Sequence, residues 1–290
     1  MNRALSDWLI LCKARIQVLS TPTACICTWM ASSGQASWGL LASTAAGITL
    51  VSSSAAALNQ LLEIEVDAQM ERTQNRPLPA GRIKPRTVAG FITVTGVVGL
   101  LTMLWINPLA AWLALSMIVL YNFIYTPLKR VTPLNTLVGA LPGAFPLLIG
   151  WAAAGNGLDL RAGVLFAILF LWQLPHFMAI AWTYREDYRR GGFVMPSHVS
   201  DAGESSARKS LAYALVLTLL VMAPFFAPLQ QPTPGLTYLL CTVPLSLYII
   251  VASAKFLWGK DRNLAARKLF HATIIYLPIL FVALVVDRYL

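Results

Sequence analysis

Nine apolar stretches, each long enough for a membrane helix, occupy most of this 290-residue chain. A helix needs about 20 apolar residues to cross a bilayer. Only 12% of the residues are charged, whereas soluble domains carry roughly 25%. We therefore predict an all-α polytopic membrane protein, a single domain over residues 1–290 built as a bundle of nine transmembrane helices. The predicted helices cover residues 16–34, 39–61, 87–106, 109–128, 136–155, 162–183, 209–228, 235–256 and 269–287.

The loops between these stretches alternate in charge. One set of loops carries every Lys and Arg except Arg161 and Arg288. Because loops rich in Lys and Arg stay on the cytoplasmic side, the N-terminus is predicted inside and the C-terminus outside. This topology explains the net charge of +10, although part of the charge could also attract an anionic substrate. We expect no nucleic-acid partner.

The N-terminal segment MNRALSDWLILCKARIQVLS does not have the pattern of a cleaved signal peptide. Lys13 and Arg15 interrupt its apolar part, and no small-residue cleavage site follows. The first helix is therefore expected to be retained. The four cysteines form no CxxC pair, and we expect them to be small apolar side chains.

Three oxygen-bearing side chains recur at every fourth residue of NQLLEIEVD, where the second apolar stretch ends: Asn59, Glu63 and Asp67. On a helix, each step of four residues returns to nearly the same face, with a drift of about 40°. These three groups can therefore converge, while Glu65 points elsewhere. An amide and two carboxylates suit Mg²⁺, which often bridges to substrate phosphates. Local ion pairs at a helix end would give the same spacing.

Basic residues follow this acidic motif and recur in the next loop on the same side. Arg72 and Arg76 lie just after the carboxylates, and Lys129 and Arg130 end the fourth stretch. Guanidinium groups bind phosphate oxygens directly, often in bidentate fashion. The first pair thus favours a Mg²⁺–diphosphate site. The second pair could be another phosphate clamp or an anchor that fixes topology.

The sixth stretch carries polar groups inside the predicted membrane span. Gln173 and His176 flank Pro175, which can bend the helix toward a cavity. Polar groups within a span are candidates for function. His176 could ligate a haem iron, donate a hydrogen bond or be a satisfied structural histidine. Asp187 follows the span on the same membrane side as the first motif and is a candidate second metal contact.

Taken together, these segments resemble the UbiA-type intramembrane prenyltransferases. The resemblance rests on four segments: NQLLEIEVDAQMERTQNRPLPAG, YTPLKRVTPLNTLVGALPGAFPLLIGW, WQLPHFMAIAW and EDYRRGGFVMPS. The first marks the superfamily, whereas WQLPHF and GALPGAFPLLIGW point to the branch that farnesylates haem. The resemblance implies nine helices and alkyl transfer from a prenyl diphosphate, with loss of diphosphate.

The resemblance also implies roles for individual residues. Catalytic and Mg²⁺-binding roles fall on Asn59, Glu63, Asp67 and Asp187, diphosphate binding falls on Arg72, Arg76, Lys129 and Arg130, and haem contact falls on His176. Two departures stand out. Thr183 and Arg185 occupy positions where the superfamily's second motif carries acids, so a second Mg²⁺ is expected to be held less tightly than the first. The sequence KAR at residues 13–15 replaces a KPR-like opening, so any role of Arg15 is in doubt.

The implied substrates are farnesyl diphosphate and protohaem IX, with haem as substrate and Mg²⁺ as cofactor. The implied location is the lipid bilayer of the bacterial cytoplasmic (inner) membrane, with the active site on its cytoplasmic side. Candidate partners are a haem A synthase and terminal-oxidase assembly factors. Three other interpretations remain open: a related enzyme with an aromatic acceptor such as a quinone precursor, a transporter, and a haem chaperone or assembly protein without catalysis.

Overall fold

The computed structural model describes residues 2–155, 157–198, 203–226 and 235–287, and every regular element within them is helical. This confirms the predicted all-α fold class. The elements are α1 Arg3–Leu11, α2 Ala14–Ala31, α3 Trp38–Leu62, α4 Ile64–Gln69, α5 Pro85–Ile106, α6 Pro108–Val119, η1 Leu120–Tyr125, α7 Thr126–Leu128, α8 Asn135–Ala153, α9 Leu160–Thr183, α10 Arg185–Arg190, η2 Pro196–His198, α11 Glu204–Phe226, α12 Leu236–Trp258 and α13 Arg262–Val286.

The long helices match the predicted membrane spans. In the described residues, eight helical segments are long and apolar enough to cross a membrane, and a bent pair of helices brings the number to nine if it is one span. Their outer surfaces are apolar: along α5, for example, Val94, Leu101 and Trp105 are exposed, as expected of side chains that face lipid. The protein is therefore an integral membrane protein. Residues 227 and 228, at the end of the predicted seventh span, lie outside the described residues.

The first predicted span, residues 16–34, corresponds to α2, and the sequence did not predict the short helix α1 that precedes it. The two helices meet at a 54° bend. Lys13 lies at this bend with φ 50° and ψ 46°, a left-handed conformation that is uncommon for a residue with a side chain. The apolar pattern of residues 16–34 does not reveal this bend, because it depends on the backbone of one residue.

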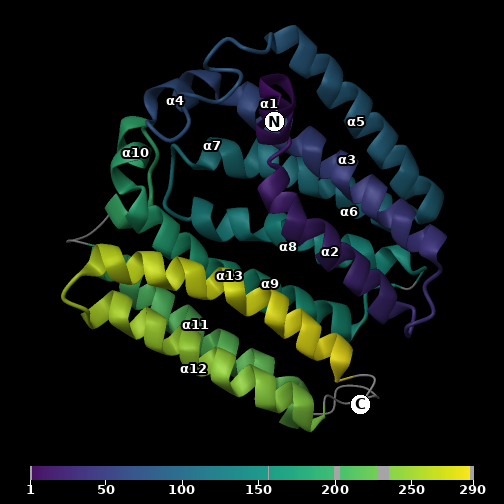
Figure 1. Cartoon of the computed structure of the whole chain (residues 1–290), viewed down its shortest axis with the longest axis vertical. Coiled ribbons are helices and arrows are strands. Elements are labelled where there is room, and N and C mark those ends of the chain that lie inside the picture. Colours follow the sequence, from purple (N-terminus) through teal and green to yellow (C-terminus); the bar gives the residue numbers. More distant parts are fainter. Residues whose placement is uncertain (1, 156, 199–202, 227–234, 288–290) are drawn as a thin grey trace. The chain divides into compact units, whose positions relative to one another are not determined.

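The chain forms two compact units. Unit 1 comprises residues 1–131, 141–158 and 186–193. Within it, α3 packs along α5 (Figure 1), and α2 packs against α3. An apolar cluster of unit 1 includes Ala24, Ile48, Val51, Met103 and Ile149. The predicted single-domain organisation stays a prediction.

Small residues bring the helices of unit 1 close together. A Cβ atom added to Gly99 of α5 would lie 2.9 Å from the backbone nitrogen of Val51 in α3, so only glycine fits there. Nearby, the Ser54 hydroxyl donates a hydrogen bond to the backbone oxygen of Ile92 at 2.9 Å. Small residues and hydroxyl groups of this kind are typical of helix contacts in membranes. They hold α3, which carries the first acidic motif, firmly against α5.

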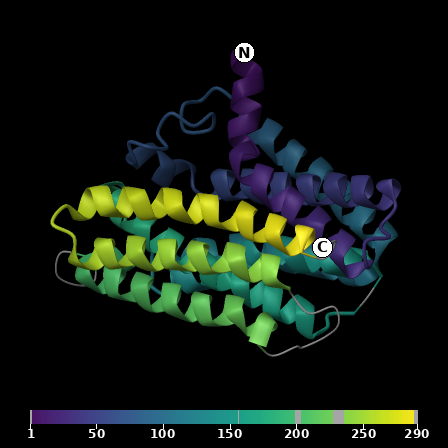
Figure 2. The ribbon, with the colours of Figure 1, turned by 60° about the horizontal axis from the view of Figure 1, so that its bottom comes forward.

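Unit 2 comprises residues 132–140, 159–185 and 194–290. Its helices α11, α12 and α13 lie side by side in both views (Figures 1 and 2), and α9 packs against α11 and α13. The buried Tyr238 of α12 ties two of these helices together, because its hydroxyl donates to the backbone oxygen of Val221 at 2.8 Å. The pair α9 and α13 holds the histidine that the sequence singled out.

Candidate functional site

The first acidic motif does not lie on one continuous helix. Helix α3 ends at Leu62 and α4 begins at Ile64, and Glu63 between them has φ −109° and ψ 18°. Nevertheless, Asn59, Glu63 and Asp67 are all buried, with 2%, 6% and 1% of their surface exposed. Glu65 is exposed, as the spacing predicted. The helix break therefore preserves the separation of the motif's buried and exposed side chains.

The buried carboxylate of Glu63 has a partner from a distant helix. The Lys129 ammonium, just after α7, lies 3.0 and 2.8 Å from the two Glu63 oxygens. The Asn59 side-chain nitrogen donates to Glu63 Oε2 at 2.8 Å. Lys129 also lies over the ring of Tyr125, 4.8 Å from its centroid. Burial of such a pair is costly unless each charge has a partner and hydrogen bonds, and here both conditions are met.

Asp67 is held in the same way by the loop that follows it. Arg76 Nη1 lies 2.7 Å from Asp67 Oδ2. The Thr73 hydroxyl donates to the backbone oxygen of Asp67 at 2.8 Å. The loop between α4 and α5 therefore turns back so that one of its arginines reaches the carboxylate.

The structure adds Lys13 and Tyr121, which the sequence did not single out as site residues. Lys13 Nζ donates to Asn59 Oδ1 at 2.8 Å and to the Tyr121 hydroxyl at 2.6 Å. Both of these partners are neutral, so neither supplies a charge that would balance the ammonium. The interruption of the first apolar segment by a lysine is the one sequence signal that pointed to this residue. Its unusual backbone at the bend directs the side chain to the acidic motif.

A π-helical turn, η1, supplies the aromatic residues of the site. Tyr121 and Tyr125 stack within it, with ring centroids 5.7 Å apart. Such turns insert one extra residue into a helix and are frequent at functional sites. The extra residue shifts everything after it by about 100° around the helix axis. The turn thus sets the direction in which Lys129 leaves the helix.

Asp187 anchors the loop that carries Arg72 and Arg76. Its two carboxylate oxygens accept hydrogen bonds from the backbone nitrogens of Glu71 and Arg72, each at 3.1 Å. The Arg72 guanidinium lies over the ring of Tyr188, 5.8 Å from the centroid. Asp187 therefore shares a unit with the first acidic motif, and it holds backbone groups of the neighbouring loop.

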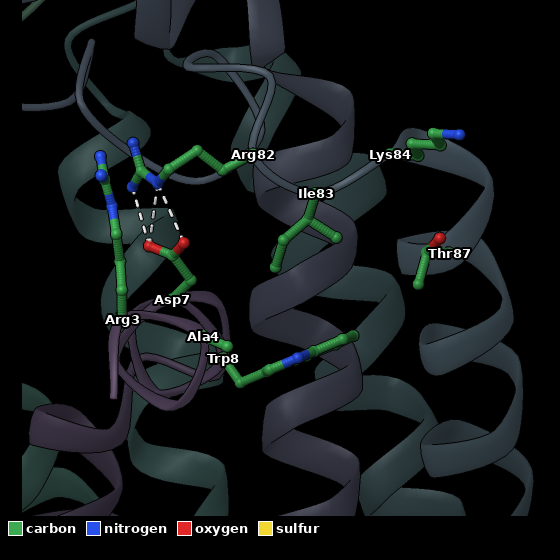
Figure 3. A pocket seen from close by; sticks show the side chains of 8 residues that line it. All are labelled: Arg3, Ala4, Asp7, Trp8, Arg82, Ile83, Lys84 and Thr87. Carbon is green, nitrogen blue, oxygen red and sulfur yellow. Dashed lines mark hydrogen bonds and ion pairs between the residues drawn. The ribbon is translucent and has the colours of Figure 1, made fainter. Parts of the chain in front are cut away.

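A second ion pair fixes the other end of this loop. Arg82 donates to both oxygens of Asp7 in α1, with distances of 2.8 to 3.1 Å (Figure 3). Arg82 also donates to the backbone oxygen of Asn75 at 2.9 Å. The hydrogen bonds to the Asp7 carboxylate raise the pKa of Arg82 above its ordinary value. Arg82 therefore links Asn75, the residue before Arg76, to Asp7 in α1.

Two predicted residues remain: Arg130 in unit 1 and His176 in unit 2. Arg130 is exposed, and none of the interactions found in the described part of the chain joins it to the motif. His176 belongs to unit 2, where its Nδ1 lies 2.8 Å from the Thr273 hydroxyl.

The donor set suits a cation that is shared with a phosphorylated ligand. No group of three or more His, Cys, Asp or Glu side chains in the described ranges is placed to hold a metal ion. Glu63 and Asp67, with the amide oxygen of Asn59, are nevertheless hard oxygen donors. Mg²⁺ needs only one or two carboxylates when substrate phosphates complete its shell. The residues present fit such an ion if Lys129 and Arg76 turn toward the phosphates.

The anchoring role of Asp187 leads to a prediction. Asp187→Asn places an amide NH₂ against a backbone N–H, so one of the two hydrogen bonds is lost. Hydrogen bonds to charged groups contribute about 1.5–3 kcal/mol each, so hydrogen exchange at the amides of residues 71 and 72 is expected to rise at least about tenfold. Hydrogen-exchange mass spectrometry measures this. Glu186→Gln, at an exposed neighbour, should leave the exchange unchanged; equal exchange in all three proteins would contradict the anchoring role.

Comparison with known proteins identifies the family. Residues 20–274 match the UbiA prenyltransferase family. A protein of Gloeobacter violaceus named protoheme IX farnesyltransferase is 41% identical over 289 residues, which covers 99% of this chain and 93% of that protein. The similarity therefore extends through both units, and the predicted resemblance is confirmed.

Solved structures show the same fold. A digeranylgeranylglyceryl phosphate synthase superimposes with a TM-score of 0.79 at 18% identity, over 98% of each chain. A UbiA homologue of Archaeoglobus fulgidus, bound to DMAPP and Mg²⁺, superimposes with a TM-score of 0.68 at 14% identity, over 97% of this chain and 99% of that one. The all-helical fold, the apolar helices and the matched residues agree: this chain belongs to the UbiA prenyltransferase family.

Proposed function

We propose that this protein transfers a farnesyl group from farnesyl diphosphate to a vinyl group of protohaem IX and, with addition of water, forms haem O and diphosphate. The observation that carries the choice of acceptor is the 41% identity, over nearly the full length, to a protoheme IX farnesyltransferase. The buried carboxylates and cations of unit 1 support a diphosphate donor. We place the protein in the bacterial cytoplasmic membrane, with this site on the cytoplasmic side and with haem A synthase or oxidase assembly factors as partners.

The cations of the site serve the leaving group. As the allylic C–O bond breaks, its electron pair stays on the diphosphate, and Lys129, Arg76 and Lys13 stabilise the growing negative charge. Lys129 and Arg76 first have to turn from Glu63 and Asp67 toward the diphosphate, and cations placed in this way stabilise charge that grows in the transition state. Arg72 adds a further cation from the anchored loop. Asn59, Glu63 and Asp67 would hold a Mg²⁺ ion, which would supply Lewis-acid stabilisation of the leaving diphosphate.

The acceptor half of the reaction needs little from the protein beyond binding and exclusion of water. The vinyl group attacks the farnesyl C1 with its own π electrons, and a C–C bond forms. Water then adds to the resulting cation and loses a proton, which gives the hydroxyethylfarnesyl side chain. An apolar environment must keep water away from the farnesyl cation until the vinyl group attacks. We assign contact with the porphyrin to His176.

The mass of the porphyrin product tests this proposal. Purified protein incubated with haem B, farnesyl diphosphate and Mg²⁺ is expected to yield haem B plus one farnesyl group and one water. The same incubation without farnesyl diphosphate is the control. Turnover only with an aromatic acid such as a quinone precursor would replace the haem assignment by that of a related prenyltransferase. No turnover together with movement of a solute across the membrane would indicate a transporter.

Removal of the metal provides a second test. A chelator such as EDTA is expected to abolish release of diphosphate, because Glu63 and Asp67 repel the anionic leaving group unless a cation lies between them. Release should return when Mg²⁺ is added in excess. Diphosphate release that is unaffected by the chelator would exclude a required divalent ion.

A further inference from the structure

The imidazole of His176 is held in a defined plane. It stacks on Trp172, one turn earlier in α9, with ring centroids 5.6 Å apart and an interplanar angle of 18°. It also stacks on Phe270 of α13, with centroids 4.9 Å apart and an angle of 24°. All of these residues belong to unit 2. His176 as a whole residue is partly buried.

Two short contacts of Thr273 determine where the imidazole carries its proton. The Thr273 hydroxyl oxygen lies 2.7 Å from the backbone oxygen of Phe270 and 2.8 Å from Nδ1 of His176. The hydroxyl has one hydrogen. If that hydrogen pointed to Nδ1, the two oxygens would face each other at 2.7 Å without a hydrogen between them. If it points to Phe270, Nδ1–H donates to Thr273, and both contacts are hydrogen bonds.

The arrangement therefore favours the imidazole with its proton on Nδ1. The Nε2 atom of the neutral ring is then left with a lone pair. A neutral imidazole whose other nitrogen donates to a fixed acceptor is the usual form of a metal-ligating histidine. The backbone oxygen of Thr273 also accepts from the Trp172 indole nitrogen at 2.8 Å. One residue thus orients the histidine and one of the aromatic rings stacked on it.

We propose that Thr273 is a positioning residue that fixes the Nδ1–H tautomer of His176, so that Nε2 offers its lone pair to the iron of the porphyrin acceptor. This inference rests on the proposed function for the identity of the ligand. The tautomer itself does not depend on it, because it follows from contacts within the free protein. The two parts can therefore be tested separately.

The tautomer is measured first, without haem. The chain has three histidines, so ¹⁵N-histidine labelling gives three pairs of ring signals, and His198→Gln and His271→Gln assign the remaining pair to His176. We expect a protonated Nδ1 and an unprotonated Nε2. Thr273→Val keeps the branched shape but removes the acceptor, and a buried N–H without a partner is costly, so the proton should move to Nε2. Thr273→Ser should retain the wild-type pattern. A protonated Nε2 in the wild type would overturn the inference.

Titration with haem B then tests the ligand. The wild type and Thr273→Ser are expected to share one Soret band, whereas Thr273→Val should bind haem at least about tenfold more weakly with a shifted band, as typical for loss of a partner behind a metal ligand. His176→Ala should lose the band of the wild type. If His176→Ala changes the spectrum but Thr273→Val does not, the proposal that Thr273 positions His176 is wrong, while His176 remains a haem contact. If His176→Ala has no effect, the assignment of His176 to the porphyrin fails.

Discussion

Asp67→Asn is expected to lower the rate of diphosphate release by about 10²–10³-fold, while the protein stays folded. Asp67 is 1% exposed and paired with Arg76 at 2.7 Å. Asparagine preserves the shape and one oxygen, but it removes the negative charge that would hold Mg²⁺ against the diphosphate. Loss of one electrostatic contact to a transition state typically costs this much in rate. The measurement is the rate of diphosphate release from farnesyl diphosphate at saturating Mg²⁺, compared between Asp67→Asn and the wild type.

Glu65→Gln is the matched control for this experiment. It removes the same charge from the same short helix, two residues away, at an exposed position. We expect its rate to equal that of the wild type. Equal rates in Asp67→Asn and the wild type would contradict the enzyme mechanism and favour a haem chaperone or a transporter. Equal losses in both variants would mean that the overall charge of this segment matters and the buried position does not.

Lys129→Met is expected to have the largest effect on stability. Removal of one partner of a buried ion pair leaves the other charge unpaired, at a cost of about 3–5 kcal/mol. Here the two side chains are 9% and 8% exposed, so Glu63 cannot reach water easily. Thermal unfolding in detergent should show a lower midpoint than the wild type. Lys255→Met, at an exposed position of α12, should leave the midpoint unchanged.

A double variant separates stability from catalysis at the same pair. Glu63→Gln combined with Lys129→Met removes both charges, so no uncompensated charge stays buried, and that charge is the main cost of losing one partner of the pair. The unfolding midpoint should therefore recover most of the loss, whereas diphosphate release should remain low. If activity recovers together with stability, the pair is purely structural and the diphosphate assignment of Lys129 is wrong.

Much of the fold could be predicted from the sequence because membrane helices obey simple rules. A run of about 20 apolar residues has one stable conformation in lipid, since every backbone group must be satisfied within the segment. The predicted spans accordingly agree with the structure to within a few residues at most ends. The largest difference is at the last span, predicted to begin at residue 269, because α13 already begins at Arg262. The sequence also did not predict the bend between α1 and α2. That bend lies at the left-handed backbone of Lys13, and no periodicity of apolar residues signals such a conformation.

The sequence predicted which residues of the site are buried, but not all of the contacts that they make. The spacing correctly separated buried Glu63 and Asp67 from exposed Glu65, because helical periodicity is a local property. It treated Asn59, Glu63 and Asp67 as one continuous helix, whereas α3 ends at Leu62 and α4 begins at Ile64, because no proline or glycine in the motif marks this break. It also did not predict that Asp187 would hold the backbone of the loop after α4. That contact joins segments more than a hundred residues apart.

The sequence by itself determined which chemical groups are present and on which local face they lie: buried carboxylates, nearby cations and a histidine within an apolar helix. Only the tertiary structure decided which groups meet. Lys13 reaches Asn59 across 46 residues, and Lys129 reaches Glu63 across 66. These pairings depend on the bend at Lys13 and on the π-helical turn η1, because each changes the direction of the chain that comes after it. The position of the proton on the His176 ring likewise depends on the hydroxyl group of Thr273, 97 residues away in the sequence. Hydrogen bonds depend on how close two groups are in space, and sequence separation does not reveal this.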